Sequence, residues 1–179
     1  MNIPLPFNLF AILIFSTSLF VPQTSSAHLM VAQNGTLNFN NAGAYMVLSL
    51  PISAVDGLDS DKDGKVTLLE FNNHRSSLIA QIKNAIFTMA HTQKILLHNI
   101  VLAPQRSHKY QNNSDLIEIT DIIIMGMFPV TYQKNTLQFH NLLYGKAAQE
   151  KLITLSVTKN HTTKLNQFDL SMTQPFWDL

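Results

Sequence analysis

The sequence contains no cysteine, which excludes disulfide bonds, thiolate metal sites and a cysteine nucleophile. Charged residues are also scarce, at 13% of the 179 residues, and the formal net charge is only +1. A chain with so little net charge offers no basic surface for nucleic acid. Because 46% of the residues are hydrophobic, the chain is not disordered either. We therefore expect one folded domain with a hydrophobic core.

Charged side chains are absent from the whole start of the chain, since the first Asp, Glu, Lys or Arg is Asp56. Residues 7–21 form an apolar run that is shorter than the roughly 20 residues of a membrane-spanning helix. Small residues follow, with Ser25 and Ala27 where a signal-peptide cleavage site requires them. We interpret residues 1–27 as a signal peptide that is cleaved after Ala27, with an uncleaved anchor or a buried helix as the alternatives. We therefore expect an exported protein, periplasmic or secreted, with no later transmembrane helix.

Short runs of alternating hydrophobic and polar residues occupy most of the predicted mature chain, residues 28–179. In residues 151–159, Ile153, Leu155 and Val157 share one face, while threonine and serine occupy the other. Such a period of two is typical of strands in an antiparallel sheet with one face toward water. We predict eight strands, over residues 29–33, 35–40, 43–50, 95–103, 115–125, 136–143, 151–159 and 165–172.

One segment has the spacing of a helix instead. Its apolar residues lie three, four or seven positions apart, at Leu68, Phe71, Leu78, Ile82, Ile86 and Met89. This spacing places them on one face of a single helix. We therefore predict a mainly β fold (α+β), an antiparallel β-sandwich of about eight strands with one long helix inserted after the third strand. The insertion is expected at about residues 56–90.

The loop before this helix, DSDKDGKVTLLE at residues 59–70, has oxygen-bearing side chains at alternate positions. Gly64 lies where the loop must turn sharply, with a positive φ that costs little only for glycine. Six positions are predicted to ligate one cation: the carboxylates of Asp59, Asp61, Asp63 and Glu70, the backbone carbonyl of Lys65, and Thr67 directly or through water. Four carboxylates around one dication suit Ca²⁺, a hard ion that prefers oxygen ligands. The loop therefore predicts a calcium site.

The loop and the helix after it resemble the EF-hand family. The resemblance implies that Glu70 binds Ca²⁺ with both carboxylate oxygens. The sequence departs from the family before the loop, where Pro51 and Gly57 interrupt the stretch in which an EF-hand has its first helix. It also contains no second loop, although EF-hands normally occur in pairs. We therefore expect the ion to be a structural clamp rather than a regulatory signal.

Residues 27–72 also resemble the start of exported bacterial EF-hand proteins, some of which continue into a HupE/UreJ-type membrane domain. This resemblance implies a periplasmic or surface-facing domain, which we expect to bind a protein partner in the envelope. One alternative is an exported copper- or nickel-handling protein that uses the mature amino-terminal His28 with a second histidine (His74, His98 or His140). The other is a calcium-stabilised hydrolase, although the chain has no G-x-S-x-G motif and we assign no catalytic residue.

Overall fold

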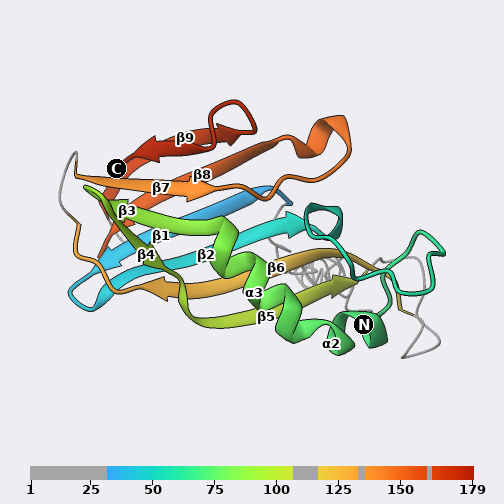
Figure 1. Cartoon of the computed structure of the whole chain (residues 1–179). Helices are drawn as coiled ribbons and strands as arrows, with labels where there is room; N and C mark the ends of the chain where they lie inside the picture. Colours follow the sequence, from blue (N-terminus) through green and yellow to red (C-terminus); the bar gives the residue numbers. More distant parts are fainter. Residues whose placement is uncertain (1–31, 107–116, 133–135, 161–162) are drawn as a thin grey trace, which may run out of the picture.

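A computed structural model describes residues 32–106, 117–132, 136–160 and 163–179. The predicted signal peptide, His28 and most of the first predicted strand lie outside the described residues. The described residues form two β-sheets, the α-helices α2 (Leu68–Asn73) and α3 (Arg75–Ala85), and the 3-10 helices η1 (Ile52–Ala54) and η2 (Ala148–Glu150). Figure 1 shows how these elements are arranged.

The larger sheet has six strands in the order β5-β6-β2-β1-β8-β9. They are β1 (Asn34–Asn40), β2 (Gly43–Pro51), β5 (His98–Arg106), β6 (Ile119–Phe128), β8 (Leu152–Lys159) and β9 (Thr163–Ser171). Neighbouring strands are antiparallel except β1 and β8, which run parallel. This pair departs from the purely antiparallel sandwich expected from the sequence. Parallel neighbours need a long connection, and here β3, β4 and β7 of the smaller sheet and both α-helices lie between β1 and β8 in the chain.

The smaller sheet is antiparallel and has four strands in the order β10-β7-β3-β4. They are β3 (Ile86–Ala90), β4 (Gln93–Leu96), β7 (Leu137–Asn141) and β10 (Phe176–Asp178). The predicted mainly β fold is thus confirmed, with ten strands among the described residues rather than about eight. The differences include β3, which lies where a helix was expected, and β10, which follows the last predicted strand.

The long helix predicted from Leu68 to Met89 is divided and ends early. His74 separates α2 from α3, with φ −97 and ψ 7. The backbone becomes extended at Ile86, with φ −116 and ψ 115, and continues as β3. The prediction was wrong over residues 86–89. The apolar spacing there fits a helix, but hydrogen bonding of β3 to β4 and β7 holds the backbone in an extended conformation.

The hydrophobic core lies between the larger sheet and a second layer, which consists of the smaller sheet and α3 (Figure 1). Phe128 of β6 meets Phe139 of β7 edge to face, with ring centroids 6.1 Å apart. Leu78 and Ile82 bury one face of α3 in the same core. No helix among the described residues is long and apolar enough to cross a membrane. The packing of α3 places α2 and the loop before it at one end of the larger sheet (Figure 1).

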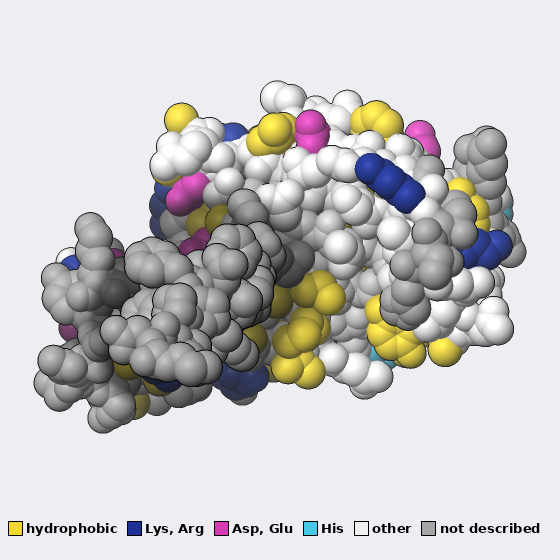
Figure 2. Space-filling view, turned by 180° about the vertical axis from the view of Figure 1, so that it is seen from behind, with side chains coloured by type: hydrophobic (Ala, Val, Ile, Leu, Met, Phe, Trp, Pro, Cys, Tyr) yellow, Lys and Arg dark blue, Asp and Glu magenta, His cyan; other side chains and the backbone are white. Residues whose placement is uncertain are grey.

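The outer face of the larger sheet carries exposed hydrophobic side chains. Tyr45 of β2 and Val101 of β5 are 42% and 52% exposed. On the neighbouring strand β6, Met127 lies beside Tyr45 and Met125 lies beside Val101. Figure 2 views the molecule from behind and shows hydrophobic side chains gathered over part of that face.

Candidate metal centre

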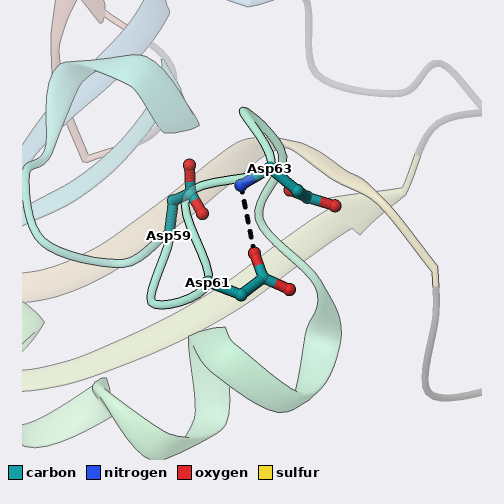
Figure 3. A group of neighbouring side chains, drawn as sticks. All are labelled: Asp59, Asp61 and Asp63. Carbon is teal, nitrogen blue, oxygen red and sulfur yellow. Dashed lines mark hydrogen bonds between the residues drawn. The ribbon is translucent and has the colours of Figure 1, made fainter.

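Three of the predicted ligands converge in the loop that precedes α2. Asp59, Asp61 and Asp63 each place one carboxylate oxygen within 4.8 Å of the other two (Figure 3). Oxygens that share a calcium ion at about 2.3–2.6 Å are separated by at most about 5 Å. The separation of the three carboxylates is therefore that of oxygens around a single cation.

Backbone N–H groups of the loop orient these carboxylates. The Gly64 N–H donates to Asp59 Oδ2 at 3.0 Å. The Asp63 N–H donates to Asp61 Oδ1 at 3.2 Å, and the Lys65 N–H donates to Asp63 Oδ1 at 2.8 Å. The other oxygen of Asp59, Oδ1, is buried and has no hydrogen-bond partner. The loop thus holds its carboxylates together while leaving an oxygen of Asp59 available to a ligand.

Two residues give the loop its curvature. Gly64 has a φ of 85°, and a Cβ added there would meet nothing within 4 Å. Backbone conformation rather than space is therefore the reason for glycine at this position. Lys62 also lies in the left-handed region, with a φ of 62°, which is uncommon for a residue other than glycine.

Glu70 lies apart from the three converging carboxylates and is bound by backbone N–H groups. Its Oε1 accepts a hydrogen bond from the Ser60 N–H at 2.8 Å. Its Oε2 accepts from the Thr67 N–H at 2.9 Å and from the Thr67 hydroxyl at 2.8 Å. The Glu70 N–H in turn donates to the Thr67 hydroxyl, which completes a capping box at the start of α2. Glu70 and Thr67 therefore join the loop to the helix, and both oxygens of Glu70 already have partners.

The same contacts explain the acidity of Glu70. The hydrogen bond from the Thr67 N–H lowers the pKa of Glu70 most, and burial opposes this effect. Hydrogen bonds from the backbone of Ser60 and Asp61 lower the pKa further. Glu70 is therefore a carboxylate at neutral pH, and its charge is held by the loop backbone.

The end of the loop pairs with residues 117–119, where β6 begins. The Leu68 N–H donates to the Ile117 carbonyl at 3.1 Å, and the Ile119 N–H donates to the Val66 carbonyl at 2.8 Å. Thr67 lies opposite Glu118 in this antiparallel bridge. The sequence predicted a strand over residues 115–125 but gave no sign that it would pair with the loop. This pairing attaches the candidate metal centre to the larger sheet.

The histidines that the structure describes are not part of the centre. The His74 Nε2 lies 2.7 Å from the Ser60 hydroxyl, beside the loop, and this contact was not predicted. Among the described residues, no group of three metal-ligating side chains includes a histidine. The copper or nickel hypothesis depends on His28, which lies outside the described residues.

No protein-family model matches the chain, and a search of curated proteins finds no match either. The chemistry of the loop is therefore inferred from its own residues and their geometry.

Proposed function

We propose that residues 59–70 bind one Ca²⁺ ion and that the protein is an exported calcium-binding domain. The observation that carries this proposal is the convergence of Asp59, Asp61 and Asp63 within 4.8 Å. Like charges at such distances repel one another, and the one ion pair among the described residues joins Lys146 to Asp56 instead. A dication would remove this repulsion, and carboxylate oxygens favour Ca²⁺ over softer metals.

The six predicted ligands differ in whether their oxygens are free to bind the ion. Asp59, Asp61 and Asp63 would bind the ion directly, together with the backbone carbonyl of Lys65. Glu70 can ligate only if its carboxylate leaves the N–H groups of Ser60 and Thr67. Bidentate ligation by Glu70, and a direct or water-mediated bond from Thr67, therefore remain predictions.

We propose that the ion is a structural clamp. The loop is joined to α2 by the capping box and to β6 by backbone hydrogen bonds. A calcium ion in the loop would therefore fix the start of the helix against the edge of the sheet. α2 spans only Leu68–Asn73, and the backbone partner of the loop is β6 rather than a second calcium loop. Neither feature provides the pair of helices that a calcium sensor opens.

We also propose that residues 1–27 direct export and that cleavage follows Ala27. The supporting observations are the uncharged start, the short apolar run and the small residues before His28. The expected partner is a protein of the cell envelope or outside the cell.

Calorimetric titration of the chain with calcium tests the proposal. We expect one ion per chain and a large loss of affinity in Asp61→Asn, which keeps an oxygen to accept from the Asp63 N–H. Asp121→Asn, which alters a carboxylate of β6 outside the loop, should bind calcium as the wild type does. Equal binding by wild type and Asp61→Asn would show that the loop is not the site.

Melting curves test whether calcium stabilises the fold, and dye binding separates a clamp from a sensor. A clamp predicts a higher melting temperature in calcium than in chelator, because a ligand at 100 times its Kd adds about 2.7 kcal/mol to the stability of the state that binds it. A sensor predicts that calcium exposes apolar surface, seen as increased binding of a hydrophobic dye. Dye binding that rises with calcium would therefore contradict the clamp.

A further inference from the structure

A cavity of about 310 Å³ lies beside the calcium loop. Its walls come from the loop, from the segment that includes η1, and from the start of β6. The aliphatic part of its lining consists of Ile52, Val55, Leu58, Val66 and Ile119. Val55, Leu58 and Ile119 also belong to the buried interior, so this part of the wall is fixed by the fold. Small-molecule sites begin at about this size, roughly 300 Å³.

Charged side chains of both signs line the same cavity. Asp56 and Lys146 neutralise each other through an ion pair of 3.1 Å. Asp59 belongs to the calcium loop. Within the described residues, the carboxylate of Glu118 and the ammonium group of Lys65 form no ion pair or side-chain hydrogen bond. When calcium occupies the loop and neutralises Asp59, the cavity therefore offers one unpaired negative charge, on Glu118, and one unpaired positive charge, on Lys65, beside an aliphatic wall.

We propose that this cavity binds a zwitterionic aliphatic molecule, namely a free α-amino acid with a branched aliphatic side chain. The ligand's ammonium group would pair with Glu118 and its carboxylate with Lys65, while its side chain packs on Ile52, Val55 and Leu58. A purely apolar ligand would pair with neither charge. A ligand with one charge would satisfy only one of them.

The cavity and the predicted calcium loop, residues 59–70, share residues 59 and 64–66. A cation that fixes the loop would also fix this wall of the cavity, so calcium should raise the affinity for the amino acid. By thermodynamic reciprocity, the amino acid should raise the affinity for calcium by the same factor. This coupling and the charge balance of the cavity rest on the proposed calcium site, whereas the cavity's position and aliphatic wall do not.

Calorimetry of the full chain with three probes tests the ligand class. The probes are L-leucine, isopentylamine, which lacks the carboxylate, and isocaproate, which lacks the ammonium group. We expect leucine to bind at least about tenfold more tightly than either analogue, because each analogue leaves one charge of the cavity unpaired. Absence of leucine binding, or equal binding of either analogue, would overturn the proposal.

Two variants test the assigned charges. Glu118→Gln and Lys65→Gln should each weaken leucine binding about fivefold, the effect of one partly exposed ion pair. Glu118→Gln should still bind calcium, because Glu118 lies outside residues 59–70 and is not a predicted ligand. Asp121→Asn, on the same strand as Ile119 but outside the cavity, is the matched control and should bind leucine normally. Unchanged leucine affinity in both Glu118→Gln and Lys65→Gln would also overturn the proposal.

The coupling is tested by repeating the leucine titration with calcium and with chelator. We expect tighter binding with calcium. Equal leucine affinity in a protein that does bind calcium would overturn the coupling. Leucine binding by a protein that does not bind calcium would overturn the proposed function and leave the amino-acid site standing.

Discussion

Glu70→Gln is the most informative single change, because Glu70 has a defined role before any ion binds. The residue is only 9% exposed, and its carboxylate accepts hydrogen bonds from Ser60 and Thr67. Glutamine keeps the shape of glutamate but offers one acceptor oxygen in place of two. In either orientation of the amide, its NH₂ group replaces an acceptor oxygen and faces the N–H of Ser60 or that of Thr67. The variant should therefore destabilise the protein even when calcium is absent.

The magnitude follows from the hydrogen bonds that are lost. A hydrogen bond to a charged group contributes about 1.5–3 kcal/mol, and leaving its buried partner unsatisfied costs at least as much as losing the bond. In the variant, the N–H group on one side of residue 70 no longer has an acceptor. We therefore expect a loss of about 2–3 kcal/mol in the free energy of unfolding. Asp63→Asn removes a similar charge at an exposed position and keeps an oxygen for the Lys65 N–H. It should cost less than about 0.5 kcal/mol.

Urea unfolding in chelator measures this contrast, with wild type, Glu70→Gln and Asp63→Asn compared at the same pH. The pKa of Glu70 is lowered below 4.5, so its contribution is present above pH 4.5 and is lost as the pH falls below that value. The wild type should therefore lose more stability on acidification than Glu70→Gln does. Equal stability of the two variants in chelator would refute the assignment of Glu70 as a helix cap that acts without the ion.

Three further changes test the fold around the site. Burial and the charge of Lys94 lower the pKa of His140 below 6.5, although Asp178 opposes them. The unfolded chain therefore takes up the proton first, and the free energy of unfolding should fall as the pH drops below 6.5. His140→Phe, which keeps an aromatic ring, should flatten this pH dependence in urea unfolding, and an unchanged slope would contradict the assignment. Thr67→Val removes the capping hydroxyl and should cost about 1 kcal/mol in chelator, whereas no loss would argue against the capping box. Phe139→Ala should cost about 3–5 kcal/mol in thermal or urea unfolding because Phe139 is fully buried between the two sheets, and a loss below about 1 kcal/mol would contradict that packing.

The loop could be predicted from the sequence because its requirements are local. Carboxylates at alternate positions and a glycine at the sharp turn are dictated by the geometry of one short segment. The structure accordingly shows Gly64 with a positive φ, and α2 begins at Leu68. Even the capping role of Glu70 could have been found, since Thr67 and Glu70 have the spacing of a capping box.

Features that depend on distant segments could not be predicted in this way. The apolar spacing through Ile86 and Met89 fits a helix, but β3 forms there because β7 and β4 provide partners. The parallel pairing of β1 with β8 and the bridge between Thr67 and Glu118 also join segments far apart in the chain. Hydrophobic periodicity shows which side of a strand is buried and does not show which strand lies beside it.

A crystal structure of the chain grown with calcium tests the central claim most directly. We expect one ion among Asp59, Asp61 and Asp63, at about 2.3–2.6 Å from its oxygen ligands, with the Lys65 carbonyl among them. The same crystal shows whether Glu70 leaves the Ser60 and Thr67 N–H groups to join the ion. Water alone between the three carboxylates, at a calcium concentration that saturates any binding seen by calorimetry, would contradict a calcium site in this loop.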